Sequence, residues 1–375
     1  MCTLDTTLPR LASGSAPPFV MPAIDLRHLL RMTDDTGLFQ HARYALPDPE
    51  HGYCLDDNAR GLVAALLEAR LRKSEDCRLP LRLYLAFVAH ALDEKTRYFR
   101  NFMGYDRRWL EKVGSGDSHG RGIWALGLAV RLGGTADVRD LCTALLLTVL
   151  ETVRQFDSPR SQALVLIGLD EALQCGCDHG AMQVVRDVLA EQLFDQLSRN
   201  GDDEWPWWED VVTYDNAKLP HALLVSGAAM GRAEMVEAAL NSLTWLLDVQ
   251  TVPEGHLSII GCDGWMSRDG NRSRFDQQPL EAYSLIHACV AAARITGQEE
   301  WSGIARRCFE WFRGVNDCKL PLVDPETGGC GDGLCPERIN RNQGAESTLA
   351  YVLSILELHE DQARRNHILS PLPQK

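Results

Sequence analysis

The sequence predicts an all-α protein, a closed (α/α)6 toroid of six helical hairpins. Apolar residues recur at helical spacing through almost the whole chain, and the alternation typical of strands is nearly absent. The helical segments alternate between two kinds, one with a charged face and one that is apolar nearly all round. A helix that is apolar all round must be buried on every side, so we expect six inner helices enclosed by six outer ones.

The helices follow one another as outer and inner partners along the chain. Outer helices, each with a charged stripe, are predicted at 25–34, 79–96, 136–155, 180–199, 232–249 and 299–315. Inner helices, rich in Ala, Gly and Leu, are predicted at 56–72, 118–132, 159–175, 214–230, 277–296 and 342–359. A spacing of about 50 to 60 residues per pair is typical of a helical-hairpin array. An open superhelix would need polar capping repeats at its ends, and none is visible, which favours the closed ring.

The longer connections all precede an inner helix. They span 35–55, 97–117, 200–213, 250–276 and 316–341. Long loops in compact domains usually carry function, so one mouth of the ring should be elaborated and the other plain. We expect a single domain at 23–362, preceded by an N-terminal extension at 1–22 and followed by a C-terminal tail at 363–375.

Composition excludes several classes of function. The 375 residues contain 38 Lys and Arg against 52 Asp and Glu, a net charge of −14 that argues against nucleic acid as the main partner. No apolar run is long enough to span a membrane, and the start lacks the apolar region of a secretory signal, so we expect a cytoplasmic protein. The twelve cysteines are therefore expected to be reduced thiols. The close pairs Cys175/Cys177 and Cys330/Cys335 lack a second pair at zinc-site spacing, so no metal or cofactor is expected.

Polar residues concentrate where the long connections enter the inner helices. Asp56 and Asp57 open the first inner helix, and one carboxylate is enough to cap it, which leaves the other for a cavity. Asp56 and Arg60 are four residues apart and can pair on one helix face. In the next inner helix Arg121 faces inward, and because buried arginine is rare unless paired, it indicates a partner carboxylate or a ligand.

The densest cluster lies at 204–221. Three tryptophans, Trp205, Trp207 and Trp208, are flanked by the acids Glu209 and Asp210. Flat indole faces can stack on sugar rings, and tryptophans bracketed by acids make a poor apolar plug because acids resist burial. This favours ligand contact. The fourth inner helix then opens with Tyr214, Asp215 and Asn216.

The last two inner helices open with further acids and amides. Asp276 is a helix cap or a cavity acid, and Gln277 and Glu281 lie four apart on one face. Gln343 and Glu346 also share a face, one turn apart. Carboxylates that face each other across a cavity are what glycosidic-bond hydrolysis needs, with one as acid and one as base or nucleophile.

Five stretches resemble a known group of proteins. Residues 33–41, 51–60, 117–121, 214–221 and 342–348 are similar to a poorly characterised bacterial family whose members occur alone or attached to glycosyltransferase domains and resemble six-hairpin glycosidases. The similarity spans about 23–360. It implies a carbohydrate-active (α/α)6 protein that acts on mannose- or glucose-containing oligosaccharides, and it implies no particular catalytic residues.

The leading hypothesis is a glycoside hydrolase, with inversion favoured by analogy with this architecture. Asp57 and Asp215 are predicted to act as general acid and base, with Glu209 or Asp276 as substitutes. The predicted hydroxyl-binding residues are His119, Arg121, Tyr214, Gln277 and Glu346, and the predicted stacking residues are Trp205, Trp207 and Trp208. Further predicted substrate contacts are Tyr53, Asp56, Arg60, Trp124, Asp210, Asn216, Glu281 and Gln343.

Three alternatives remain open. A sugar epimerase or isomerase on the same ring would usually abstract protons with histidine. His119 and His221 are available, but no histidine lies at the start of the last inner helix, and His221 is interpreted as a core residue. A non-catalytic sugar-binding partner of a glycosyltransferase would need only the binding residues. A terpene cyclase is remote, because Asp56 and Asp57 lack the further acid of an aspartate-rich metal motif.

Overall fold

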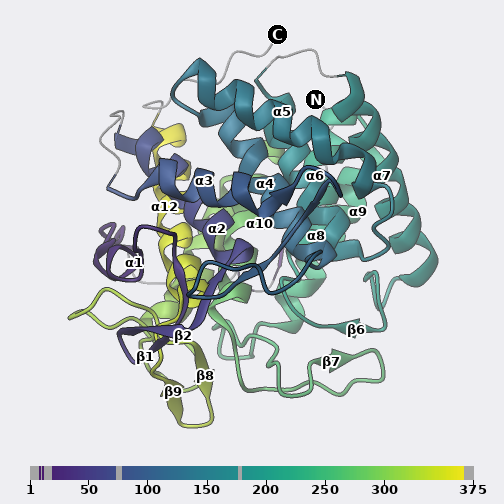
Figure 1. The fold of residues 1–375 in the computed structure, drawn as a ribbon. Coiled ribbons are helices and arrows are strands. Elements are labelled where there is room, and N and C mark those ends of the chain that lie inside the picture. The colour runs from purple at the N-terminus through teal and green to yellow at the C-terminus, as the bar shows by residue number, and fades with distance from the viewer. Residues whose placement is uncertain (1–7, 10, 12–18, 73–77, 176–179, 367–375) are drawn as a thin grey trace.

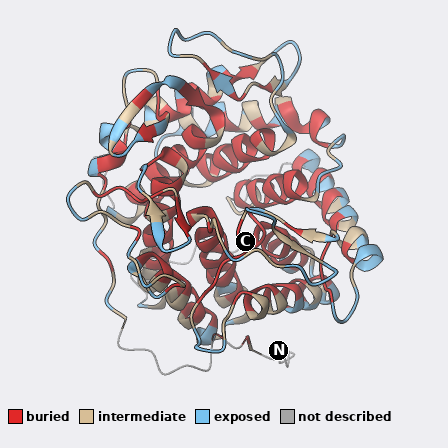
Figure 2. Ribbon diagram, turned by 90° about the horizontal axis from the view of Figure 1, so that it is seen from below, coloured by how far each residue is buried: buried red, intermediate tan, exposed pale blue. Residues whose placement is uncertain are grey.

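The computed structural model describes residues 8–9, 11, 19–72, 78–175 and 180–366, and their helices form two concentric layers (Figures 1 and 2). The inner helices are α2 (Leu55–Arg72), α4 (Gly116–Leu132), α6 (Pro159–Leu173), α8 (Lys218–Met230), α10 (Pro279–Thr296) and α12 (Ala345–Arg365). The outer helices are α1 (Arg27–Arg31), α3 (Leu81–Ala91), α5 (Ala136–Val153), α7 (Gly180–Asn200), α9 (Ala233–Val249) and α11 (Glu299–Phe309). None of the described helices is both long and apolar enough to cross a membrane.

The inner layer closes on itself. Each inner helix packs against the next in the chain, and the last, α12, packs against the first, α2. The inner helices are buried on almost all sides, as Figure 2 shows from the end that carries the long connections. The predicted (α/α)6 toroid is therefore confirmed, because a closed ring is what buries six helices with so few charged positions.

The closest approach in the inner layer joins α4 to α6. A Cβ on Gly127 would lie 1.9 Å from the carbonyl oxygen of Gly168, and one on Gly168 would lie 2.7 Å from that of Ile123. The two helix backbones are therefore in direct contact at these glycines. No side chain fits between them.

Substitution of Gly127 by alanine should destabilise the fold, because the added methyl forces α4 and α6 apart. We expect the free energy of unfolding to fall by about 1–3 kcal/mol, measured by urea denaturation. The matched control is Gly303→Ala in α11, where the new Cβ would have only the far end of Arg307 nearby, at 3.9 Å. That control should be neutral or up to about 1 kcal/mol more stable. A Gly127→Ala protein as stable as the control would contradict this packing.

The long connections gather at one end of the ring and carry short antiparallel strands, seen below the helices in Figure 1. In the first sheet β1 (Phe39–Arg43) pairs with β2 (Leu46–Cys54), which pairs with β5 (Phe102–Met103). Three two-stranded ladders follow: β3 (Leu92–Asp93) with β4 (Tyr98–Phe99), β6 (Val211–Val212) with β7 (Met266–Ser267), and β8 (Gly333–Cys335) with β9 (Arg338–Asn340). Most of these strands are too short to show a two-residue period, which is why the sequence pattern missed them.

Several helix boundaries differ from the expected ones. Helix α1 has only five residues, and α11 ends at Phe309, where a 3-10 turn, η2 (Glu310–Arg313), follows. Helix α8 begins at Lys218 and not at 214, so residues 214–217 still belong to the connection. Cys177, part of one close cysteine pair considered above, lies outside the described residues.

Candidate functional site

Two adjoining cavities open where the long connections meet the inner helices. The first, of about 610 Å³, is lined among others by His41, Asp57, Arg60, Asp276, Asp332 and Arg338, and we call it the first lobe. The second, of about 720 Å³, is lined among others by Asn101, Ser115, Asp117, Arg121, Tyr214 and Trp265, and we call it the second lobe. Both lobes are bordered by Asp56, Phe102, Cys262, Gln278 and Glu346. Each volume is within the usual range for a small-molecule site.

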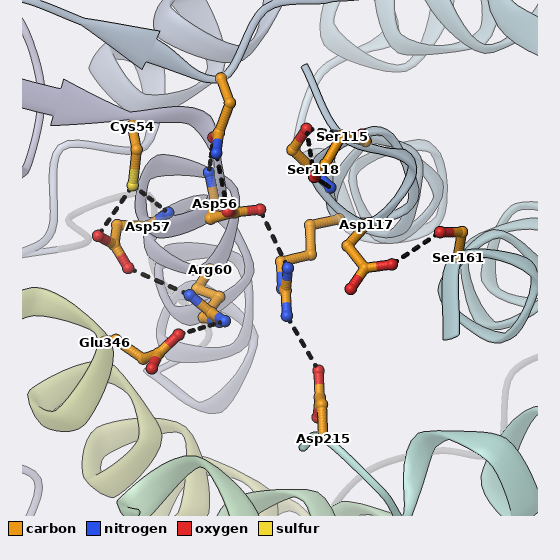
Figure 3. A network of polar contacts seen from close by, with 12 residues as sticks. Cys54, Asp56, Asp57, Arg60, Ser115, Asp117, Ser118, Ser161, Asp215 and Glu346 are labelled. Atoms are coloured by element: carbon orange, nitrogen blue, oxygen red, sulfur yellow. Dashed lines mark hydrogen bonds and ion pairs between the residues drawn. The ribbon is translucent and has the colours of Figure 1, made fainter. Parts of the chain in front are cut away.

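Arg60 of α2 joins two carboxyl groups at the floor of the first lobe (Figure 3). Its guanidinium lies 3.1 Å from Asp57 Oδ1 and 2.8 Å from Glu346 Oε2. The Asp57 side chain is almost fully buried and also accepts a hydrogen bond from the Cys54 thiol (3.0 Å). Burial raises the pKa of Asp57 to about 7, because the loss of hydration outweighs the attraction of Arg60, and the neighbouring Glu346 charge adds to the rise. Glu346, by contrast, has a side chain that is 43% exposed at the cavity.

Arg121 of α4 forms a second bridge across the ring. Its guanidinium donates to Asp56 Oδ1 (3.2 Å) and to Asp215 Oδ2 (3.3 Å) (Figure 3). Asp215 lies in the connection that precedes α8. Asp56 also accepts from Asn101 Nδ2 (3.1 Å). The N-terminal ends of α2 and α4 and the entry to α8 are thereby connected by charge pairs. The predicted inward orientation of Arg121 toward a partner carboxylate agrees with this structure.

Asp215 occupies a strained position. Its φ of +49° lies in the left-handed region, which non-glycine residues rarely adopt. Glu281 of α10 stabilises this conformation by accepting hydrogen bonds from the backbone N–H groups of Asp215 and Asn216 and from Asn216 Nδ2 (2.8 Å). Burial raises the pKa of Glu281 to about 7, and the Asp215 charge adds to the rise. Asp215 is 3% exposed and its Oδ1 has no hydrogen-bond partner among the described residues.

Lys218, the first residue of α8, is a buried cation. It is 2% exposed, its ammonium donates to His287 Nδ1 (2.7 Å), and it sits over the rings of Trp124 (4.9 Å) and Tyr283 (4.5 Å). His287 Nε2 is 3.6 Å from Glu357 Oε1. Burial lowers the pKa of Lys218 to about 8, although Asp215 and Glu357 oppose the shift. Trp124, a predicted substrate contact, is therefore covered by Lys218.

Substitution of Lys218 by methionine should remove a contribution to the free energy of unfolding that rises with pH. The pKa is about 8 in the folded chain and 10.5 ordinarily, so between these values the unfolded chain binds the proton and the folded chain does not. Stability from this group therefore rises with pH across that window, by up to about 3 kcal/mol. Relative to Lys218→Met, the wild-type protein should gain stability from pH 8 to 10 in urea denaturation. The exposed Lys112→Met control should show no such trend, and parallel curves for all three proteins would refute the shift.

The three tryptophans of the fourth long connection are buried and line neither lobe. Trp207 and Trp208 are 0% and 1% exposed, and Trp205 is 6% exposed. Trp205 and Trp207 pack against Trp245 of α9, with ring centroids 4.9 and 5.7 Å apart, and Trp208 Nε1 donates to the Leu193 carbonyl of α7. The prediction that these indoles stack on sugar is wrong, because they fill the space between the connection and the outer helices.

Other predicted contacts are also engaged within the protein. His119 Nε2 accepts from the Phe99 backbone N–H (3.1 Å), its ring packs against Phe99 and Phe156, and burial lowers its pKa to about 4. This is a core histidine and not a hydroxyl-binding one. Three more predicted contacts have their polar groups bonded to neighbouring side chains: Tyr53 to Asp34, Gln277 to Asp317, and Gln343 to Thr327.

The remaining predicted acids separate into two groups. Asp276 lines the first lobe. Glu209 is paired with Arg160, and Asp210 is a surface residue, with an 86% exposed side chain 3.7 Å from Arg268. Neither Glu209 nor Asp210 is among the residues that line the two lobes. Of the predicted substrate contacts, Asp56, Arg60, Arg121, Tyr214, Gln277 and Glu346 do line them.

Sequence reasoning missed several residues of the mouth. His41 and Asp332 line the first lobe, and Asp117 and Trp265 line the second. Asp332 accepts the Gly344 N–H (2.8 Å), and burial raises its pKa to about 6. Asp117 was detectable, since it lies in the first turn of α4, the same position as the acids that were predicted. The other three lie on long connections, where no periodicity indicates direction.

Comparison with known proteins defines the structural class. No protein-family model matches the chain, and no curated protein matches it. Among solved structures it is similar to cellobiose 2-epimerase from Spirochaeta thermophila (TM-score 0.68, 15% identity, 92% of this chain and 94% of that one). It is also similar to a D-mannose isomerase (0.67, 12%, 89% and 94%) and to a GH76 α-mannanase from Bacteroides thetaiotaomicron (0.61, 9%, 84% and 88%).

These neighbours are enzymes that act on sugars, and the protein shares their (α/α)6 fold. The structural similarity establishes the fold, and sequence identities this low do not identify the reaction.

Proposed function

We propose that this protein is a glycoside hydrolase that cleaves a mannose- or glucose-containing oligosaccharide at the junction of the two lobes. The observation that carries the proposal is the pair of carboxyl groups on Arg60. Asp57 is buried with a pKa of about 7, and Glu346 is open to the cavity and ion-paired. Two neighbouring carboxyl groups in such different environments are typical of an acid and its ionised partner.

In the proposed reaction Asp57 is the general acid. It gives its proton to the glycosidic oxygen as the bond from that oxygen to the anomeric carbon breaks. The carboxylate of Glu346 either takes a proton from the water that attacks the anomeric carbon or attacks that carbon itself, after which water releases the sugar. Both routes consume one water. In the first, Glu346 loses the proton that it gained to solvent and Asp57 takes one from solvent; in the second, the water that releases the sugar gives a proton to Asp57.

We place the protein in the cytoplasm, where thiols such as Cys54 stay reduced.

Asp215 takes a different role from the one expected from sequence. It is buried, is absent from the residues that line the lobes, and holds Arg121. We therefore infer that Asp215 positions Arg121 and Asp56, and that Glu346 replaces it as the ionised partner of Asp57.

One further neighbour of similar fold is a glycoside hydrolase. An α-1,6-mannanase of Salegentibacter is similar in fold (TM-score 0.61, 11% identity, 89% of this chain and 96% of that one), and its structure is that of an inactive variant in which two consecutive aspartates are replaced by alanine.

The direct test is incubation with manno- and gluco-oligosaccharides, followed by NMR of the products. Release of shorter sugars supports hydrolysis, and the first anomer formed distinguishes inversion from retention. Binding without turnover would support a non-catalytic sugar-binding partner of a glycosyltransferase instead.

A second candidate is a sugar epimerase or isomerase. His41 lines the first lobe, where a histidine base could act, and two of the similar folds are a cellobiose 2-epimerase and a D-mannose isomerase. In the same NMR experiment, exchange at C2 or conversion of aldose to ketose without cleavage would support this reaction and overturn hydrolysis.

A further inference from the structure

The second lobe differs from the first in its aromatic lining. Phe102, Tyr214 and Trp265 border it, and of these only Phe102 also borders the first lobe. The first lobe is lined mainly by charged and amide side chains. Aromatic faces bind the C–H faces of sugar rings with little dependence on hydroxyl configuration, whereas polar groups select hydroxyl positions.

Trp265 is fixed by the connection between α9 and α10. Its backbone N–H donates to the Gly261 carbonyl (3.0 Å), and its carbonyl accepts from the Ser273 N–H (2.7 Å). Its φ of +59° is in the left-handed region, which is unusual for a bulky residue. The residue is nonetheless partly exposed and borders the lobe. A strained and well-bonded backbone that presents an indole to a cavity is typical of a functional position.

Tyr214 is fixed beside it. The phenol donates to Asp117 Oδ2 (2.6 Å), and the Arg160 guanidinium stacks on its ring at 4.9 Å. The Tyr214 and Trp265 rings are 6.3 Å apart at 46°. Asp117 and Ser115 border the same lobe and offer hydrogen bonds to hydroxyl groups. The lobe therefore combines an aromatic surface with polar groups.

We propose that the second lobe is the leaving-group subsite, that Trp265 is its stacking platform, and that the substrate is consequently an oligosaccharide of at least two units. This inference rests on the proposed hydrolysis. Asp56 and Glu346 border both lobes, so a bond that spans the junction lies beside carboxyl groups. The first lobe then holds the unit whose anomeric carbon reacts, and its polar lining selects that sugar.

The test compares substrates with and without a sugar in the second lobe. The probes are α-1,6-mannotriose with α-mannosyl fluoride, and cellotriose with β-glucosyl fluoride, because fluoride is too small to reach the indole. Trp265→Ala should lower kcat/KM about tenfold or more for the trisaccharide and leave that for the fluoride unchanged within about twofold. Trp265→Phe should retain most of the activity. Trp109→Ala is the matched control, since Trp109 borders neither lobe.

The outcomes separate this inference from the proposed function. Unchanged fluoride turnover shows that the variant is folded, so equal losses on both substrates, or no loss on either, would overturn the subsite while hydrolysis stands. If the wild-type protein cleaves neither pair, the leaving-group assignment is overturned together with hydrolysis of these substrates, and calorimetric binding of the two trisaccharides tests only whether Trp265 is a stacking platform. Weaker binding by Trp265→Ala supports that role. Equal binding, or none by the wild-type protein, overturns it.

Discussion

Asp57→Asn should lower kcat for oligosaccharide cleavage by about 10²–10⁴-fold, because asparagine has no proton to give to the leaving oxygen. Turnover of the glycosyl fluoride should fall much less, since fluoride leaves without protonation. The wild-type rate should decrease above about pH 7 as Asp57 ionises, and this decrease should disappear from the residual activity of the variant. Steady-state kinetics from pH 5 to 9 with both substrates would measure these effects.

Two controls keep this assignment falsifiable. Asp210→Asn changes an exposed acid outside the lobes and should leave kinetics unchanged. Asp276→Asn changes another acid of the first lobe. If Asp276→Asn removes the alkaline decrease and Asp57→Asn does not, Asp276 is the general acid and our assignment is wrong. The free energy of unfolding gives an independent measurement. The pKa of Asp57 is about 7 in the folded chain and 3.8 ordinarily, so between these values the folded chain binds the proton and the unfolded chain does not. As the pH rises from about 4 to 7, the wild type should therefore lose stability relative to Asp57→Asn.

Arg121→Met should destabilise the fold by about 3–5 kcal/mol, because it leaves Asp215 buried without its cation and releases Asp56. Urea denaturation would measure the loss. The double variant Arg121→Met, Asp215→Asn should recover part of it, since no buried charge is then left unpaired. The oligosaccharide activity should stay low in both, because Asp56 then keeps only its hydrogen bonds with Asn101.

The matched control is Arg268→Met, which removes an arginine that is paired with Asp202 and Asp210 at the surface. Exposed pairs contribute little, so its cost should be about 1 kcal/mol or less. Equal effects of the two substitutions, or no recovery in the double variant, would show that the bridge between α4 and α8 is unimportant for the fold.

Five of the predicted residues that line the lobes share one property. Asp56, Asp57, Arg60, Arg121 and Glu346 all lie in the first two turns of inner helices. A helix start fixes both the position and the direction of its first side chains, and ring closure brings the starts together. Polar residues there in otherwise apolar helices are therefore predicted from the sequence alone to face the cavity.

The orientation of residues on the connections was predicted less consistently: Tyr214 and Asp276 line the lobes as expected, and others do not. The indoles of Trp205, Trp207 and Trp208 turn toward α7 and α9, whereas Trp265, which no pattern singled out, faces the second lobe. Lys218 is a further case, since its charge is satisfied by His287 and two aromatic rings inside the ring. Each of these environments depends on residues far away in the chain.

The sequence by itself determined the closed ring of helical hairpins, the end of the ring that carries the long connections and the helix starts that supply the central acids, because all three follow from periodicity and spacing along one chain. Only the tertiary structure decided which carboxyl group is buried against Arg60, which is open to the cavity and which tryptophan borders it. Those properties depend on the path of each connection and on how far neighbouring side chains exclude water, and neither is encoded in a local pattern.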